Sequence, residues 1–328
     1  MLGLCQDDKL KSDILYKSLH KIMKKIHNKS LEQTITSLIG NTPLIDFQIG
    51  VKNANILVKL ETYNLTGSVK DRMALFMIQQ AQKKGLLKKG STIIEATTGN
   101  TGIAFSALSA LFGYKMIAVI PEGQSIERVN MMKAYGAKVI QTPHKEGPMG
   151  SCILRDKLAK EIPNSWVPNQ FGNPDNIKEH QFGTAQEIIK QLKGRTVDYY
   201  IHGVGTGGTL IGVGIELKKK FPKMQVLALE PSESAVLLGC KPGFHNIQGI
   251  GEGFIPDLIN KKYLDGVVTV STKEAIEESR NIAKTTGLFV GFSSGANIVA
   301  IKNIAKKLKS PKTFLTVFAD RGERYLSI

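Results

Sequence analysis

The stretch Gly203-Val204-Gly205-Thr206-Gly207-Gly208-Thr209 indicates the class of fold. The pattern around it predicts a strand over Tyr199–His202 and a helix over Leu210–Phe221, so the glycines form the turn between them. Glycines at such a turn let backbone N–H groups approach a phosphate, and the dipole of the following helix favours the anion. The segment therefore predicts an α/β unit with an anion-binding loop.

The glycine loop by itself leaves two classes of cofactor open. Gly203, Gly205 and Gly208 satisfy the pattern G-x-G-x-x-G, and Glu230 ends the next predicted strand. That combination is typical of dinucleotide binding and indicates an NAD-dependent oxidoreductase. A monophosphate cofactor fits the same loop equally well, because a single phosphate needs only the cradle of N–H groups. Only residues outside the loop can distinguish a dinucleotide from a monophosphate cofactor.

Two other polar turns lie earlier in the chain. Lys70 lies in Gly67-Ser68-Val69-Lys70-Asp71-Arg72, where a helix is predicted to begin, and a lysine among small residues can approach a carbonyl. The turn Thr97-Thr98-Gly99-Asn100-Thr101-Gly102 offers hydroxyls, an amide and N–H groups that suit an amino acid's carboxylate. Because Lys70 and Asn100 have no role in a dehydrogenase, the three motifs together indicate a pyridoxal phosphate (PLP) enzyme.

Short apolar strands alternate with longer helical patterns from residue 35 onward. The predicted strands cover residues 55–60, 92–95, 115–120, 138–141, 199–202, 225–230 and 313–318. The predicted helices cover residues 71–84, 102–111, 125–135, 182–192, 210–221, 273–286 and 296–308. Such alternation predicts parallel sheets covered by helices on both faces, with ligands at the carboxyl ends of the strands. All the candidate loops follow predicted strands or begin helices.

The length and the composition limit the choice of function further. A chain of 328 residues with a net charge of +16 invites a nucleic-acid hypothesis, but aromatic residues are only 7% and do not interleave with the basic runs. We therefore expect no nucleic-acid partner, and no apolar run is long enough to span a membrane. Cys5, Cys152 and Cys240 form no disulfide or zinc pattern, which favours the cytosol and predicts no metal site.

We expect three segments along the chain. Residues 1–32 form an N-terminal extension in which Leu15, Leu19, Ile22 and Ile26 have helical spacing, so an amphipathic helix is predicted. Residues 33–170 form an N-terminal α/β domain that carries Lys70 and the Asn100 loop, and residues 171–328 form a C-terminal α/β domain that carries the phosphate loop. Part of the N-terminal segment is expected to cross over into the second domain.

The chain resembles the cysteine synthase (O-acetylserine sulfhydrylase) and cystathionine β-synthase family. The resemblance rests on the motifs quoted above, on Leu38-Ile39-Gly40-Asn41-Thr42-Pro43-Leu44 and on Arg321-Gly322-Glu323-Arg324-Tyr325-Leu326-Ser327. It implies a fold-type II PLP enzyme related to tryptophan synthase β subunits, with two three-layer α/β/α domains. It also implies a homodimer that makes L-cysteine and acetate from O-acetylserine and sulfide, with serine acetyltransferase as a candidate partner.

The resemblance assigns roles to individual residues. Lys70 matches the lysine that binds PLP and moves the Cα proton, and Asn100 matches the residue that hydrogen-bonds the cofactor's 3′ oxygen. The predicted phosphate cup consists of Gly205, Thr206, Gly207, Gly208 and Thr209. Ser293, in Gly291-Phe292-Ser293-Ser294-Gly295, matches the serine that faces the pyridine nitrogen. The predicted substrate-binding residues are Thr97, Thr98, Gly99, Thr101, Gln170, Gly251 and Glu252.

Plainer roles remain open for several of these residues. Asn100 could only stabilise a turn, Ser293 and Ser294 could be helix N-caps, and Gln170 could lie on the surface. His202, just before the phosphate loop, is expected to be a packed residue at a strand end.

Three features depart from the family pattern. Leu65 and Thr66 stand where proline and a small residue are usual, and Thr98 replaces a serine. Glu252, in Gly249-Ile250-Gly251-Glu252-Gly253-Phe254, occupies a position that is often small. An acidic group there could repel bisulfide, attract the ammonium of a second amino acid or act as a base; it could also point to solvent. The alternative to a cysteine synthase is therefore a cystathionine β-synthase-like enzyme or a cysteine-consuming, sulfide-producing enzyme.

Overall fold

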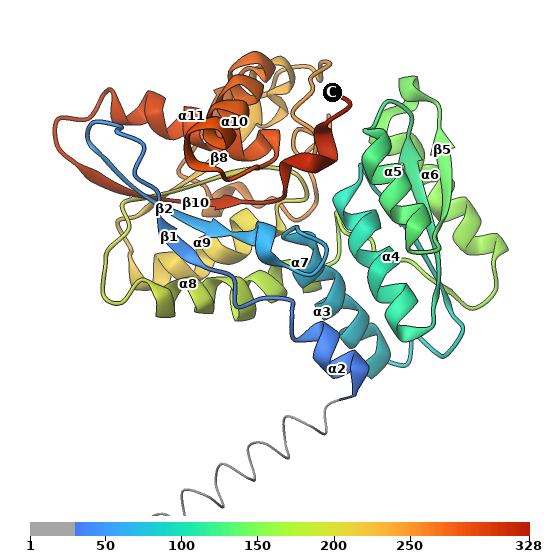
Figure 1. The fold of residues 1–328 in the computed structure, drawn as a ribbon. Coiled ribbons are helices and arrows are strands. Elements are labelled where there is room, and N and C mark those ends of the chain that lie inside the picture. Colours follow the sequence, from blue (N-terminus) through green and yellow to red (C-terminus); the bar gives the residue numbers. More distant parts are fainter. Residues whose placement is uncertain (1–29) are drawn as a thin grey trace, which may run out of the picture. The chain divides into compact units, whose positions relative to one another are not determined.

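The computed structural model describes residues 30–328 and divides the chain into two units. The first unit, as far as it is described, contains helix α2 (Leu31–Thr36), which begins with a capping box between Ser30 and Gln33. The second unit comprises residues 39–328 and carries both sheets (Figure 1). The amphipathic helix predicted within residues 1–32 lies almost entirely outside the described residues.

The larger sheet has six strands in the order β1-β2-β10-β7-β8-β9. All neighbours are parallel except β1 and β2. Figure 1 shows β2, from the start of the chain, beside β10 from its end, and the register pairs Ile56 with Phe314. The strands are β1 (Leu44–Asp46), β2 (Ala54–Leu60), β7 (Tyr199–Gly203), β8 (Gln225–Pro231), β9 (Gly266–Val270) and β10 (Lys312–Phe318).

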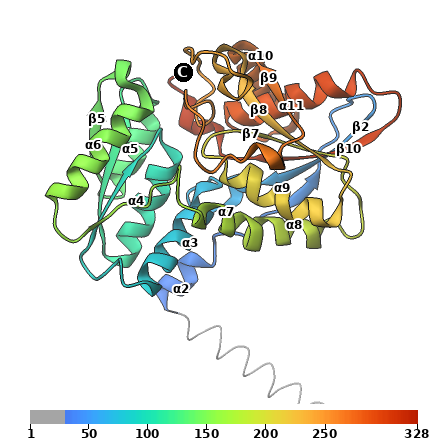
Figure 2. The same ribbon diagram turned by 180° about the vertical axis from the view of Figure 1, so that it is seen from behind.

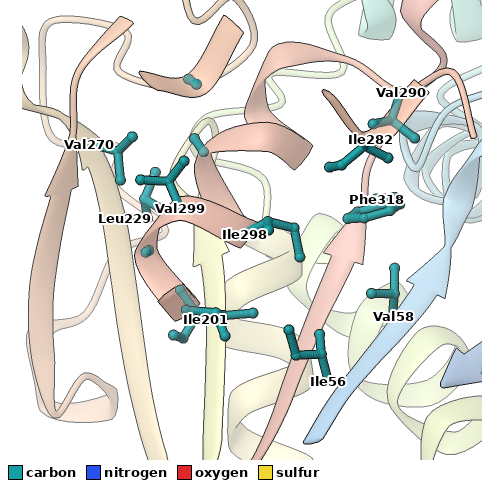
Figure 3. Packing of buried hydrophobic residues seen from close by; sticks show 14 of the residues in the cluster. Ile56, Val58, Ile201, Leu229, Val270, Ile282, Val290, Ile298, Val299 and Phe318 are labelled. Carbon is teal, nitrogen blue, oxygen red and sulfur yellow. The ribbon is translucent and has the colours of Figure 1, made fainter. Parts of the chain in front are cut away.

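Helices cover both faces of this sheet (Figure 2). Alternating residues of β2 face opposite sides: Ile56 and Val58 pack with the α10–α11 layer, and Leu57 packs with the α8–α9 layer. Figure 3 shows the first of these cores, where Ile298 of α11 lies among side chains from the strands. The helices are α8 (Ala185–Gln191), α9 (Gly208–Lys220), α10 (Thr272–Thr286) and α11 (Phe292–Ala305).

The smaller sheet has four parallel strands in the order β5-β4-β3-β6. Ile93 faces a core formed with α3, α4 and α5, whereas Ile94 faces α6. The elements are α3 (Lys70–Lys83), β3 (Thr92–Ala96), α4 (Asn100–Phe112), β4 (Lys115–Pro121), α5 (Ile126–Ala134), β5 (Lys138–Thr142), α6 (Gly147–Glu161) and β6 (Ser165–Trp166). Both sheets are therefore sandwiched between helices, as the alternation predicted.

The structure differs from the prediction in three helical regions, and strands β1, β6 and β9 were not predicted. The helical region predicted over residues 182–192 begins earlier, with α7 (Asp175–Glu179) followed by a π-helical turn, η3 (His180–Thr184). The helix predicted from Ala296 begins at Phe292, so Ser293 and Ser294 lie in its first turn and are not its N-cap. Helix α6 was missed, because its sequence opens with Gly147-Pro148 and has little apolar periodicity.

The domain boundaries stay a prediction, although β1 and β2 do belong to the same sheet as the C-terminal strands. Within residues 30–328, no helix has the length and apolar character needed to cross a membrane. The same residues contain no cluster of three or more histidine, cysteine or acidic side chains that could hold a metal ion.

Candidate active site

One cavity lies where the carboxyl ends of strands from both sheets meet. Its wall includes Thr97 after β3, Gly205 after β7 and Asp320 after β10. Twelve of the fifteen residues predicted for the site line it: Lys70, Thr97, Thr98, Asn100, Thr101, Gln170, Gly205, Thr206, Gly207, Thr209, Glu252 and Ser293. Tertiary structure therefore brings together motifs that are up to 223 positions apart, from Lys70 to Ser293.

The remaining three predicted residues, all glycines, lie behind this wall. Gly99 is the N-cap residue of α4, and the side chain of Arg128 packs directly against it. Gly208 begins α9 and abuts the side chain of Asn176. Gly251 lines an adjoining cavity, with its backbone at φ +68°. Their contacts indicate that they shape the loops, whereas the other twelve face the cavity.

Lys70 is the first residue of α3 and faces the cavity. Among residues 30–328, its ammonium makes no hydrogen bond or ion pair with another side chain. Burial lowers the pKa of Lys70, and the negative charges of Glu252 and Asp320 partly oppose that shift. A lysine without a fixed partner and with a lowered pKa can serve as a nucleophile toward an aldehyde.

The turn from Thr97 to Gly102 is held by its own hydroxyls. The Oγ1 of Thr97 accepts hydrogen bonds from the backbone N–H of Gly99 (2.9 Å) and Gly102 (3.1 Å). Thr101 Oγ1 donates to Gln170 Oε1 at 2.5 Å, and Gln170 Nε2 donates to the carbonyl of Ala96 at 2.7 Å. Gln170 is thus almost fully buried against the turn, which is inconsistent with a surface position.

In the glycine loop, the glycine positions have no room for side chains. A Cβ on Gly205 would lie 2.4 Å from the carbonyl oxygen of Gly249, so the backbones of the two loops are in direct contact. The Oγ1 of Thr209 lies 3.1 Å from His180 Nε2, and Thr206 Oγ1 accepts from Asn176 Nδ2 at 3.1 Å. Because this turn opens α9, a helix of 13 residues, its N–H groups form a cradle for a phosphate.

Ser293 and His202 complete the wall on the side of the larger sheet. Ser293 is in the first turn of α11 and is almost completely buried. His202 is a packed residue near the end of β7, as expected, with its ring stacked on Tyr200. Burial, and next the positive charge of Lys70, lower the pKa of His202 to about 3, so the imidazole is neutral at physiological pH.

Glu252 connects the reaction cavity with a second, larger cavity of about 580 Å³. Thr98 Oγ1 donates a hydrogen bond to Glu252 Oε1 at 3.3 Å, so two departures from the family pattern contact each other. Burial raises the pKa of Glu252, while the positive charges of Lys70 and Arg128 lower it. The side chain is partly buried at the wall of both cavities and does not point to open solvent.

Sequence reasoning missed two charged residues of the cavity wall, Arg128 and Asp320. Arg128 is fully buried, its Nε donates to Ser125 Oγ at 2.9 Å, and its guanidinium lies 5.0 Å from the ring of Tyr325. Asp320 stands one position before the C-terminal motif that begins at Arg321, so a slightly longer motif would have included it. Arg128 gave no local signal, because its helix has the charge pattern of a surface helix.

The wall fits a PLP group. It offers an amine without a side-chain partner, a helix N-terminus that opens with a glycine-rich turn, and a separate turn of hydroxyls for a carboxylate. A dinucleotide is less well matched, because both carboxylate oxygens of Glu230 accept a hydrogen bond from Leu237 N (3.1 and 3.0 Å). The acidic residue of the dinucleotide pattern is therefore already engaged within the protein.

Comparison with known proteins shows the family to which this chain belongs. The pyridoxal-phosphate dependent enzyme family matches residues 35–320, and the chain belongs to that family. It is therefore a PLP enzyme, and its fold is fold-type II. This family assignment replaces the alternative of an NAD-dependent oxidoreductase.

Three similar proteins indicate which kinds of PLP enzyme this chain resembles most. A cysteine synthase of Staphylococcus aureus is 45% identical over 295 residues, which cover 89% of this chain and 95% of that protein. The solved structure of an O-acetylserine dependent cystathionine β-synthase from Helicobacter pylori is 40% identical, with a TM-score of 0.86 over 90% of this chain and 97% of that one. A hydrogen sulfide-producing enzyme from Fusobacterium nucleatum is 40% identical, with a TM-score of 0.85 over 90% of each chain.

Proposed function

We propose that this enzyme catalyses β-replacement on an activated serine, with O-acetylserine and sulfide giving L-cysteine and acetate. The observation that carries the proposal is the single cavity that joins Lys70, the hydroxyl-rich turn and the glycine loop. Similarity to a cysteine synthase over 89% of the chain supports the choice of substrates. In the net reaction the Cβ–O bond breaks with its electron pair leaving on acetate, and a Cβ–S bond forms.

In this proposal Lys70 and Asn100 would hold the cofactor at its aldehyde and 3′ oxygen, and the turn Gly205–Thr209 would hold its phosphate. Ser293 would face the ring nitrogen. When bound, PLP supplies an electron sink for the pair left at the substrate's Cα. A serine does not hold the ring nitrogen protonated as an aspartate would. Ser293 would therefore leave the ring a weaker electron sink than an aspartate would, which favours departure of the β-group over transamination.

Lys70 moves the proton at Cα. The lowered pKa of its ammonium increases the fraction of neutral amine, which can accept that proton and later return it. Thr97, Thr98, Thr101 and Gln170 bind the substrate's carboxylate and so orient the Cα–H bond toward Lys70. Gly99 and Gly251 shape the two loops that enclose the substrate.

The visible spectrum of the purified protein tests this proposal. We expect an absorption band of lysine-bound PLP that Lys70→Ala abolishes, whereas Lys83→Ala, at the far end of the same helix, keeps it. Borohydride reduction followed by peptide mapping should find the cofactor on Lys70. Cysteine should then appear when O-acetylserine and sulfide are supplied. An unmodified Lys70 would refute the assignment.

A second candidate function rests on Glu252. We propose that the adjoining cavity of about 580 Å³ admits a second amino acid, whose ammonium pairs with Glu252. The enzyme would then make cystathionine or lanthionine, or release sulfide from cysteine. Among the similar structures are an O-acetylserine dependent cystathionine β-synthase and a hydrogen sulfide-producing enzyme. Alternatively, Glu252 acts as a base toward the incoming thiol or water.

Product analysis separates the two functions. Wild type, Glu252→Gln and Glu252→Ala are each supplied with O-acetylserine or cysteine as donor and with sulfide, homocysteine or cysteine as acceptor. If Glu252 selects the acceptor, both variants shift the products toward those made with sulfide, because they lose the charge that attracts an ammonium and repels an anion. Equal product ratios in all three proteins would show that Glu252 does not select the acceptor.

We also propose a cytosolic homodimer with serine acetyltransferase as a candidate partner. The absence of a disulfide pattern among the three cysteines supports a reducing compartment. Light scattering of the purified protein, with and without an added serine acetyltransferase, tests the dimer and the complex. A monomer at micromolar concentration would contradict the dimer.

A further inference from the structure

The segment Ala319–Asp320 follows β10 and contacts two of the candidate cofactor loops through its backbone. The carbonyl of Ala319 accepts a hydrogen bond from Val69 N at 2.8 Å, next to Lys70, and Asp320 forms an antiparallel bridge with Ser68. The carbonyl of Asp320 accepts from Gly291 N at 3.0 Å, just before Ser293. The position of Asp320 is therefore fixed relative to both loops.

The side chain of Asp320 reaches the third loop at Asn100. Asn100 Nδ2 donates to Asp320 Oδ2 at 2.6 Å, and Arg324 Nη1 donates to Asn100 Oδ1 at 2.5 Å. A carboxylate can only accept hydrogen bonds, and a guanidinium can only donate them. An asparagine amide is nearly symmetric in shape, so only its partners decide which end carries the N–H groups. With Asp320 on one end and Arg324 on the other, only one orientation satisfies both.

Asp320 and Arg324 are themselves held firmly. Each is about 1% exposed, and Arg324 also donates to the carbonyl of Thr66. Tyr325 donates its hydroxyl proton to the same Oδ2 of Asp320, and the guanidinium of Arg128 lies over the ring of Tyr325. Side chains with so little freedom lose little entropy when they hold a neighbour, so they can enforce a single orientation on Asn100.

The orientation matters because Asn100 and Asp320 both line the cavity. Nδ2 carries two hydrogens, and within residues 30–328 only one of them has a partner. The second hydrogen is left for a ligand in the cavity. If the amide turned over, a carbonyl oxygen would take that place and repel an oxygen of the ligand.

We propose that Asp320 and Arg324 are positioning residues that hold the Asn100 amide so that it presents an N–H donor, and not a carbonyl oxygen, to the cofactor. The proposal rests on the proposed function in one respect, the role of Asn100 toward the 3′ oxygen of PLP. A donor there stabilises the ionised oxygen, so the orientation set by Asp320 controls both the affinity and the electronic form of the bound cofactor.

The variant Asp320→Asn tests the proposal in the holoenzyme. An asparagine at 320 has the same shape but can donate as well as accept, so only Arg324 still favours one orientation of the Asn100 amide and the preference is weakened. We expect the dissociation constant of PLP to rise about ten-fold. The ratio of the long-wavelength to the short-wavelength absorption band of bound PLP should fall. Unchanged values in a folded variant would overturn the proposal.

Two further comparisons separate positioning from loss of packing. In an Asn100→Ala background, Asp320→Asn should produce no additional change in the band ratio, because Asp320 acts through Asn100. An effect that persists there would contradict the proposal. Tyr325→Phe removes the other hydrogen bond to the Asp320 carboxylate but leaves that carboxylate as an acceptor for Asn100, so its band ratio should fall much less than that of Asp320→Asn. A fall as large as that of Asp320→Asn would also contradict it.

Arg324 provides a second route should Asp320→Asn not fold. Arg324→Met removes the donor that faces Asn100 Oδ1 and should lower the band ratio, whereas Arg324→Lys keeps a donor and should largely restore it. Equal ratios in the two variants would overturn the role of Arg324. A wild-type protein without any band of lysine-bound PLP would contradict the proposed function itself, whereas a normal wild type with unaffected variants contradicts only the positioning role.

Discussion

Both carboxylate oxygens of Asp71 accept hydrogen bonds from Thr66: Oδ2 from the backbone N at 2.6 Å, and Oδ1 from the hydroxyl at 2.5 Å. The two residues enclose the turn that leads into Lys70. Asp71 is completely buried, and burial raises its pKa to about 6 although the bonds from Thr66 favour the ionised form. A residue that departs from the family pattern therefore stabilises the first turn of α3.

Replacing Thr66 by valine keeps the shape of the side chain and removes the hydroxyl. Because Asp71 then loses a buried hydrogen bond, we expect the free energy of unfolding to fall by about 1–3 kcal/mol. Urea unfolding at pH 7.5, where Asp71 is mostly ionised, measures the change. Thr66→Ser keeps the hydroxyl and should recover most of the loss; a valine variant as stable as wild type would show that the hydroxyl does not matter.

A buried ion pair connects α3 with the larger sheet. Arg72 Nε donates to Glu61 Oε2 at 2.5 Å, and Arg72 Nη2 donates to Glu187 Oε2 at 2.8 Å. Arg72→Met would leave Glu61 buried without its counter-ion, at a cost of about 3–5 kcal/mol in unfolding free energy. The double variant Glu61→Gln/Arg72→Met should lose less than the sum of the single variants.

The exposed pair of Lys273 and Glu277 is the control for that experiment. Lys273→Ala should change the unfolding free energy by less than about 0.5 kcal/mol, since exposed pairs contribute little. Additive effects of the two buried substitutions would contradict a direct interaction between Arg72 and Glu61.

His202 should make the stability depend on pH. Its pKa is about 3 in the folded chain, below the ordinary histidine value of 6.5, so the unfolded state binds the proton first as the pH falls. Stability contributed by the neutral imidazole is present above pH 6.5 and is lost progressively toward pH 3. Between pH 7 and pH 5 this single group should cost about 2 kcal/mol.

Urea unfolding of wild type and His202→Asn at both pH values measures the contribution of His202. The difference in the free energy of unfolding between pH 7 and pH 5 should be smaller in His202→Asn than in wild type. His144→Asn, at an exposed histidine, is the matched control and should keep the wild-type difference. A His202→Asn protein with an unaltered pH dependence would exclude a neutral, buried imidazole.

Gly208 should be needed for cofactor binding. A Cβ there would lie 2.0 Å from Asn176 Oδ1, so Gly208→Ala must displace Asn176 and with it the turn that holds Thr206. We expect PLP to bind at least about ten-fold more weakly. Gly214→Ala, in the same helix, meets only the side chain of Val226 at 3.1 Å and should leave PLP affinity nearly unchanged.

A variant that removes the side chain of Asn176 tests whether the clash with this residue is the cause. In an Asn176→Ala background, Gly208→Ala should weaken PLP binding much less than it does in wild type, because the clashing atom is gone. Equal losses in the two backgrounds would mean that the contact with Asn176 is not the cause.

The parts of the fold that the sequence predicted were those with strong local signals. Apolar periodicity located most strands and most helices, since the period of 2 or 3.6 residues is set by the backbone, but it missed strands β1, β6 and β9. Helix α6 was missed for want of such a period, and the π-helical turn His180–Thr184 has no sequence signature that a periodicity argument could use. Both are decided by packing against the rest of the molecule.

The site could be predicted where its chemistry lies in short motifs. Lys70, Asn100 and the glycine loop each carry their signal within seven residues, and they do line one cavity. Arg128 and Asp320 could not be found in this way, because a buried arginine and a surface arginine have the same local sequence.

By itself, the sequence determined the α/β class and the family, and it located the short motifs that line the cavity, because these depend on local periodicity and on short motifs. Only the tertiary structure decided that Asp320 contacts Asn100, that Arg128 packs against Gly99 and that Glu252 meets Thr98. These contacts join positions 29 to 220 residues apart. The first and third pairs join the two sheets and come together only when the carboxyl ends of their strands meet, whereas Arg128 and Gly99 need only the packing of α4 and α5.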